Sequence, residues 1–118
     1  MNRIEISVMQ PAAALRAFAE TWHRAEAGQA IAPRVTFGSL HELFTTITEA
    51  RMDLMRCLAA HPGLAALQLA KRLDRDPLEV QTDVAALVEL GLLALDDNGA
   101  LSAPYDEVLI HAAIRDAA

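Results

Sequence analysis

Aromatic side chains and cysteine are scarce in this chain of 118 residues. Only 4% of the residues are aromatic although 53% are hydrophobic, so the core has to be built from Ala, Leu, Val, Ile and Met. Such a composition, with little glycine or proline, favours helices. The one cysteine, Cys57, excludes a disulfide within the chain. Its place in an apolar helical pattern is typical of a buried structural cysteine.

Long hydrophobic runs and a basic leader are also absent. No window approaches the roughly 18 unbroken apolar residues of a membrane helix, so we expect no membrane partner. The first ten residues, MNRIEISVMQ, do not combine a basic start with a long apolar stretch, and this argues against a signal peptide. These absences predict a cytoplasmic protein, and its length is sufficient for a single hydrophobic core.

Positive charge is in short supply. The chain has 10 Lys and Arg against 16 Asp and Glu, a formal net charge of −6. Non-specific affinity for nucleic acid depends on neutralising phosphates, so a net negative protein gains little of it from its overall charge. Any basic surface that contacts a polyanion must therefore be local.

Side-chain combinations that carry catalysis or bind metals are missing as well. The histidines fall in four different expected elements, without metal-ligand spacing and without a cysteine pair; they are His23, His41, His61 and His111. No glycine-rich phosphate loop appears, and no serine lies in a nucleophile elbow. Since nucleophile, base and stabilising group do not occur together, we expect no enzyme, no metal site and no cofactor.

The first 38 residues predict a strand and a helix. RIEISV alternates between apolar and polar residues, as a half-buried strand does. A helix is expected from Pro11 to Ala27, with Gly28 ending it. Its large apolar residues, Leu15, Phe18 and Trp22, form a narrow stripe. That stripe suits either the rest of the domain or a second copy of the chain, and we take the three residues as anchors of a homodimer. A connector over 28–38, containing Pro33, follows.

Two helices are expected next. Ser39 and Glu42 form a capping box for the first helix, and Thr48 caps a second that runs to about His61. The residues expected to face the core are Leu40, Leu43, Phe44 and Ile47 in the first, and Met52, Met55, Leu58 and Ala59 in the second.

The stretch LAALQLAKRLDRDPLEVQTDVAALVELG predicts two helices around a tight turn at Asp74 and Arg75. Asp76 caps the second helix, Pro77 takes its first position, and Glu79 completes another capping box. The expected inward residues are Leu64, Leu67, Ala70 and Leu73, then Val80, Val84, Leu87 and Val88. Gly91 ends the second helix.

A β-hairpin and a strand complete the chain. LLAL, DDNG and ALSA read as two strands and their turn, with Asn98-Gly99 supplying positive φ angles. EVLIHAAI is apolar enough to be a strand covered on both faces.

This order of elements predicts a mainly α fold with a small β component. We expect a winged helix-turn-helix with an N-terminal strand and helix and a C-terminal strand. Residues 1–38 would be a strand-helix dimerisation segment with its connector, and residues 39–118 the winged helix-turn-helix domain with the C-terminal strand.

Two segments resemble a known family: FAETWHRAEAG, and the run SLHELFTTITEARMDLMRCLAAHPGLAALQLAKRLDRDPLEVQTDVAALVELGLLALDDNGALSAPYDEVLI. The family consists of small prokaryotic winged-helix proteins, which are predicted transcriptional regulators with MarR-like DNA-binding domains. The resemblance spans roughly Ala14 to Ile114. It implies a homodimeric regulator that binds double-stranded DNA and controls its own operon. Several such proteins are thought to be antitoxins, so the resemblance also implies a possible toxin partner.

Candidate DNA contacts lie on both helices and on the hairpin. Phosphate contacts are expected from Lys71, Arg72 and Arg75, flanked by Arg51 and Arg56. In the major groove, Leu78 suits a thymine methyl, Gln81 an adenine, and Thr82 a base edge or phosphate. At the hairpin tip Asn98 offers hydrogen bonds, next to two aspartates that phosphates repel. The alternative is that these residues only cap helices and form an ordinary solvated surface.

Acidity of the second helix leaves two hypotheses open. Residues 76–90 carry four acids and no Lys or Arg, whereas the resembling family usually has basic or hydrogen-bonding residues on the exposed face. One hypothesis is the DNA-binding regulator. The other is an antitoxin or interaction module whose DNA binding is weak or lost and whose acids attract a basic toxin. The acids proposed to attract the toxin lie on the second helix and at the hairpin tip; they are Glu79, Asp83, Glu89, Asp96 and Asp97. An operator, an effector, the toxin and the oligomeric state are not defined by the sequence.

Overall fold

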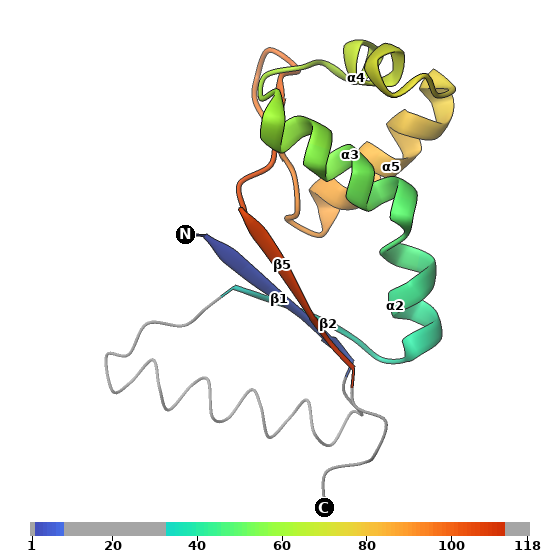
Figure 1. The fold of residues 1–118 in the computed structure, drawn as a ribbon, viewed down its shortest axis with the longest axis vertical. Coiled ribbons are helices and arrows are strands. Elements are labelled where there is room, and N and C mark those ends of the chain that lie inside the picture. Colours follow the sequence, from blue (N-terminus) through green and yellow to red (C-terminus); the bar gives the residue numbers. More distant parts are fainter. Residues whose placement is uncertain (1, 9–32, 113–118) are drawn as a thin grey trace, which may run out of the picture. The chain divides into compact units, whose positions relative to one another are not determined.

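The computed structural model describes residues 2–8 and 33–112. The helix expected over 11–27, with Leu15, Phe18 and Trp22, lies outside the described residues. The described part is a mixed α/β structure with four helices and five strands (Figure 1). The chain divides into two compact units: residues 1, 3–45 and 107–118, and residues 2 and 46–106. The last strand belongs to the same unit as the first, whereas the sequence analysis grouped it with the winged helix.

A three-stranded sheet forms the first unit. Its strands are β1 (Arg3–Val8), β2 (Arg34–Phe37) and β5 (Glu107–His111), in the order β2-β1-β5, and both neighbours run parallel to β1. The expectation that 28–38 is only a connector is therefore wrong for its last residues. Four residues are too few to show a strand periodicity in the sequence, and β2 is defined by its pairing with β1.

One face of this sheet is apolar and the other carries ion pairs. Ile4, Ile6 and Phe37 are buried. On the opposite face, Arg3 Nε lies 3.3 Å from Glu107 Oε1, and Arg34 Nη2 lies 3.7 Å from Glu5 Oε2. Each pair also occupies matching positions in neighbouring strands. The cross-strand charges thus agree with the parallel register.

Helix α2 (Leu40–Thr46) begins after Ser39 as predicted, but only half of the predicted capping box forms and the helix buries less than expected. Ser39 Oγ accepts a hydrogen bond of 3.1 Å from the Glu42 amide. Leu43 is 1% exposed, but Leu40 and Phe44 are 41% and 64% exposed, which contradicts their placement in the core. A helix of seven residues buries only a few side chains. Here the buried side chains are Leu43 and Ile47, which directly follows the helix.

The second unit begins with α3 (Glu49–Ala60), capped as predicted. Thr48 Oγ1 accepts a hydrogen bond of 3.2 Å from the Arg51 amide. The buried face is Leu54, Met55 and Leu58. Met52 is only half-buried and Ala59 is exposed, so the predicted inward face was partly wrong. It missed Leu54, because apolar residues lie on several sides of this helix between its four charged residues, so more than one rotation buries a similar apolar area.

Helix α4 (Ala66–Leu73) shows a similar rotation. Leu69 and Ala70 are 0% and 1% exposed, whereas Leu67 is 57% exposed and was wrongly assigned to the core. The helix begins after Leu64, and the preceding loop is tied to the hairpin. The Gly63 amide donates to the Leu101 carbonyl at 2.8 Å, and the Leu101 amide donates to the Leu64 carbonyl at 2.9 Å. These two tertiary hydrogen bonds hold the loop before α4 against the hairpin.

Helix α5 (Pro77–Glu89) follows a turn with the predicted chemistry. Asp74 adopts the left-handed conformation, with φ 54° and ψ 50°. Asp76 caps α5 by accepting a hydrogen bond of 2.9 Å from the Leu78 amide, and Pro77 is the first helical residue. The predicted second capping box does not form, because the Glu79 carboxylate lies 3.9 Å from Arg75 instead.

The inward face of α5 is largely as predicted. Val80, Val84 and Leu87 are buried, and Val88 is half-buried. Gly91, just beyond the helix, has a φ of 80°. No helix in the described part of the chain is both long enough and apolar enough to cross a membrane.

The hairpin consists of β3 (Ala94–Leu95) and β4 (Leu101–Ser102), which are antiparallel. Its turn differs from the prediction, because only Gly99 has a positive φ, 83°, and Asn98 does not. The Asp96 carboxylate accepts hydrogen bonds from the Asn98 and Ala100 amides, both 2.9 Å. An aspartate-centred loop therefore replaces the two-residue turn.

Candidate nucleic-acid interface

Exposed side chains on the first half of α5 form the centre of the candidate interface. Leu78 is 72% exposed, and Gln81 and Thr82 are exposed as well. Thr82 Oγ1 donates a hydrogen bond of 3.0 Å to the Leu78 carbonyl, which leaves its oxygen lone pairs available to an outside donor. Residues 2–8 and 33–112 provide no hydrogen-bond partner for the Gln81 amide. This face presents one apolar, one amide and one hydroxyl group.

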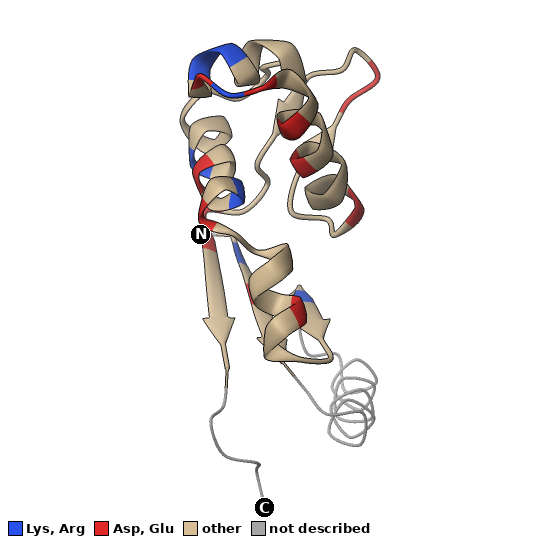
Figure 2. Ribbon diagram, turned by 90° about the vertical axis from the view of Figure 1, so that its right-hand side faces the viewer, with Lys and Arg blue, Asp and Glu red and all other residues tan. Residues whose placement is uncertain are grey.

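A small basic patch, Lys71 and Arg72, lies at the end of α4. Both residues are exposed. Figure 2 shows the blue end of α4 directly before the turn that leads to α5. Among the described residues, no carboxylate lies within 4.0 Å of either side chain. The patch is thus free to meet an anionic ligand.

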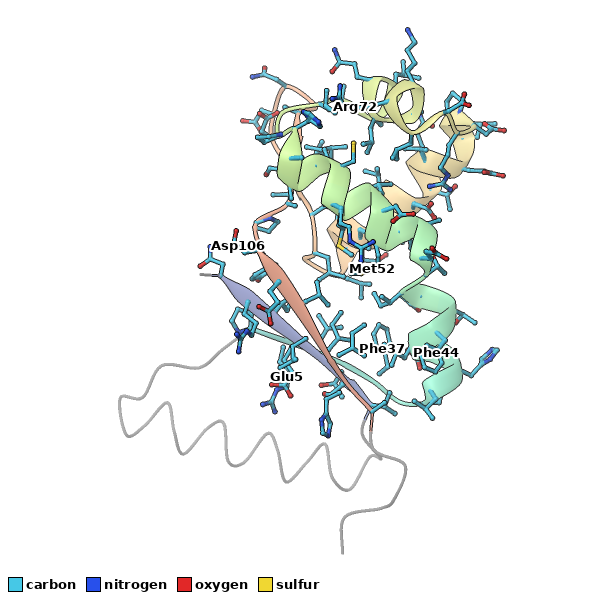
Figure 3. The ribbon with its side chains drawn as sticks, in the orientation of Figure 1. Glu5, Phe37, Phe44, Met52, Arg72 and Asp106 are labelled. Atoms are coloured by element: carbon cyan, nitrogen blue, oxygen red, sulfur yellow. The ribbon has the colours of Figure 1, made fainter. Side chains whose placement is uncertain are left out.

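His61, which directly follows α3, contacts the basic patch in a way that sequence reasoning missed. Arg72 is labelled in Figure 3. The distance between its Nη2 and His61 Nε2 is 2.7 Å. Because a guanidinium only donates, the imidazole Nε2 accepts in this arrangement. The two residues are 11 positions apart, and no sequence pattern indicates that they meet.

Arg75 does not extend this patch. Its Nη2 lies 2.9 Å from Asp83 Oδ2, and its side chain is only 24% exposed. Arg51 is held in the same way: its Nε lies 3.0 Å from Asp83 Oδ1, and its Nη1 donates to the Thr46 carbonyl at 2.8 Å. The sequence analysis had placed both arginines near DNA phosphates. In the structure, both are bound to one aspartate within the protein.

Asp83 is therefore the centre of a charge cluster, Arg51–Asp83–Arg75. The three side chains are 15%, 14% and 24% exposed. Two guanidinium groups surround one carboxylate, so the local sum is +1 and the negative charge of Asp83 is screened from the exterior. Sequence reasoning had grouped Asp83 with the exposed acids, because its arginine partners lie on α3 and in the turn.

The remaining acids still make the unit negative. Residues 46–106 contain five Lys and Arg and ten Asp and Glu, a net charge of −5. Exposed acids lie at both ends of α5 and at the hairpin tip; they are Asp76, Glu79, Glu89, Asp96 and Asp97. Two of them are used locally, because Asp76 and Asp96 accept backbone hydrogen bonds. Within the described ranges, no three His, Cys, Asp or Glu side chains gather as a metal site.

Comparison with family models places these elements in one family. The model of HVO_A0114 matches residues 46–110, which is 65 of the 118 residues and more than half of the chain. The chain belongs to the HVO_A0114 family. The matched region contains α3, α4, α5 and the hairpin, and with them every residue of the candidate interface. No curated protein and no solved structure matches the chain.

Proposed function

We propose that this HVO_A0114 family member is a winged helix-turn-helix transcriptional regulator that binds double-stranded DNA in the cytoplasm and represses its own operon. One observation carries the proposal: α4, a tight turn and α5 precede a β-hairpin, and a basic patch with no carboxylate partner among the described residues flanks the exposed start of α5. Helix-turn-helix proteins place the second helix in the major groove, with its N-terminal residues at the bases. In this arrangement α5 is the recognition helix and β3–β4 the wing.

The exposed groups of α5 suit base contacts. Gln81 can pair with adenine and Leu78 can contact a thymine methyl group, while Thr82 reaches a base edge or a phosphate. A good bidentate base contact contributes about 1–3 kcal/mol of discrimination. These side chains therefore supply preference, whereas affinity has to come from phosphates.

Phosphate contacts come from Lys71 and Arg72, with Asn98 donating from the wing. Each phosphate contact adds about 0.9 to the salt slope of binding. We assign Arg75 a different role from the one expected: it holds the turn and α5 together through Asp83. With two basic side chains in each subunit, a homodimer presents four to its two half-sites, which lie about one DNA turn apart. Leu15, Phe18 and Trp22 remain the anchors proposed for that dimer, outside the described residues.

A titration of fluorescent duplex DNA tests this proposal. The duplex carries the region upstream of the chain's own operon, and salt is varied from about 50 to 200 mM, a range over which phosphate contacts change affinity strongly. Replacing both Lys71 and Arg72 with alanine is expected to lower the salt slope by about 2 per subunit and to weaken binding to every sequence. Gln81→Ala is expected to change sequence preference more than affinity.

Arg34→Ala is the matched control, since it removes one positive charge from the sheet of the other unit. It is expected to leave the slope nearly unchanged. Absence of binding at about 50 mM salt, where electrostatic affinity is large, would refute the proposal. Equal effects of the control and of the Lys71 and Arg72 changes would refute the assigned interface.

A second function is favoured by the exposed acids of the same unit. Glu79, Glu89 and Asp97 make no backbone cap among the described residues and are exposed, Glu79 near Arg75 at 3.9 Å. An acidic surface of this kind suits a basic protein, and an antitoxin that binds an RNA-acting toxin is the corresponding proposal. Co-purification with a small basic protein encoded next to the chain tests it. Binding that survives Glu79→Gln combined with Glu89→Gln would argue against this surface.

A further inference from the structure

Strand β5 has a free edge in the described structure. The sheet order is β2-β1-β5, so β1 pairs with one side of β5 and no described strand pairs with the other side. Leu109 and Ile110 are 44% and 45% exposed, and His111 is exposed as well. The prediction that this strand is covered on both faces is therefore wrong for the described part of the chain. An apolar edge strand without proline or an inward charge is a template for pairing with another strand.

The sequence of β5 is complementary to itself when it is reversed. Its five residues are Glu, Val, Leu, Ile and His, from Glu107 to His111. An antiparallel pair centred on Leu109 opposes Leu109 to its own copy, Val108 to Ile110, and Glu107 to His111. Each apolar residue thus meets an apolar residue, and each acid meets an imidazole that donates a hydrogen bond or carries a positive charge.

The faces of the sheet agree with this pairing. The register pairs Ile4 with Val108 and Ile6 with Ile110, so Val108 and Ile110 lie on the apolar face of the sheet. Leu109 lies on the face that carries Glu5. Opposed residues of an antiparallel pair point to the same face. Two joined sheets therefore continue the apolar face and the charged face across the junction.

We propose that β5 is a homodimer interface, in which two copies of the chain join their sheets edge to edge about a twofold axis at Leu109. A parallel pairing through the same edge turns one copy over, so the apolar face of one sheet would continue into the charged face of the other. A slip by one residue turns apolar side chains onto the charged face. The antiparallel pairing about Leu109 avoids both penalties. The result is a six-stranded sheet, with Glu107 between Arg3 of its own chain and the second copy's imidazole.

Light scattering and sedimentation equilibrium of the full chain, without DNA, test this interface. Leu109→Lys places two ammonium groups directly opposite each other and is expected to raise the dimer dissociation constant about tenfold or more. Because Leu109 is 44% exposed, the variant should retain its fold, which circular dichroism checks. Leu95→Lys, at a residue of the hairpin that is 55% exposed, is the matched control and should leave the dimer intact.

A charge reversal tests the register itself. His111→Glu opposes two pairs of glutamates and is expected to raise the dimer dissociation constant about tenfold or more. Adding Glu107→His to this variant restores opposite partners and should recover most of the affinity. In a Cys57→Ala background, Leu109→Cys should be joined into a covalent dimer by a short bismaleimide, whereas Leu95→Cys should not.

A wild-type monomer at about 100 µM, well above the micromolar dissociation constants of modest interfaces, would overturn the inference. So would a dimer that neither Leu109→Lys nor His111→Glu weakens. The inference does not depend on DNA binding, because these substitutions leave α4 and α5 untouched. A wild-type dimer that Leu109→Lys weakens and that binds duplex DNA at low salt supports both proposals. A wild-type dimer that Leu109→Lys weakens but that binds no DNA supports this interface alone.

Discussion

Replacing Asp83 with alanine is expected to be among the most destabilising changes of a charged residue in residues 46–106. The Asp83 carboxylate accepts hydrogen bonds from Arg51 Nε at 3.0 Å and from Arg75 Nη2 at 2.9 Å. A hydrogen bond to a charged group contributes about 1.5–3 kcal/mol, and breaking a buried ion pair costs about 3–5 kcal/mol. The three side chains are 14–24% exposed, so hydration of the groups left without a partner offsets part of this decrease. We therefore expect a decrease of about 3 kcal/mol in the free energy of unfolding.

Urea unfolding and a thermal melt of the full chain measure this decrease. At about 4 °C per kcal/mol for a chain of this size, the melting temperature is expected to fall by about 12 °C. Asp97→Ala at the hairpin tip is the control, and as an exposed residue it should stay within about 0.5 kcal/mol of wild type. Arg51→Met and Arg75→Met each remove one ion pair with Asp83, and each should lower the free energy of unfolding by less than Asp83→Ala does. A loss below about 1 kcal/mol for Asp83→Ala, with an unchanged m-value, would show that the cluster is solvated and contributes little.

Three further predictions concern the core and the turns. Leu69→Ala, at a side chain that is 0% exposed, should lower the free energy of unfolding by about 2–5 kcal/mol. Leu67→Ala, at a side chain that is 57% exposed, should lower it by less than about 1 kcal/mol. Equal decreases in urea unfolding would contradict the observed rotation of α4. Gly91→Ala should lower the free energy of unfolding by about 1–2 kcal/mol through backbone strain alone, because φ is 80° and nothing lies within 4 Å of an added Cβ. An unchanged free energy of unfolding in the same assay would mean that the turn relaxes. Asp74→Gly should raise the melting temperature by a few degrees, since glycine adopts a φ of 54° without a steric penalty.

Local signals in the sequence were sufficient to place most element boundaries. Ser39, Thr48 and Asp76 each accept a hydrogen bond from a nearby backbone amide at a helix start. The alternation in RIEISV corresponds to β1, and Gly91 follows the end of α5. These features depend on interactions within about four residues, so they can be predicted without knowledge of the tertiary structure.

The direction in which each helix faces was less predictable. Leu67 and Phe44 are exposed, and Leu54 and Leu69 are fully buried. In each of these helices several rotations bury a similar apolar area, so packing against neighbouring elements decides among them. The strand β2 shows the same limit, since four residues become a strand only by pairing with β1.

The sequence by itself determined where helices start and stop, the sharp turn between α4 and α5, and the overall deficit of positive charge. Only the tertiary structure decided which charges are available. It brings Arg51 and Arg75 to Asp83 from different elements and leaves Lys71 and Arg72 exposed. It also places β5 at an edge of the sheet. The physical reason is that capping and turn chemistry act between near neighbours in the chain, whereas ion pairing and strand edges depend on residues that only folding brings together.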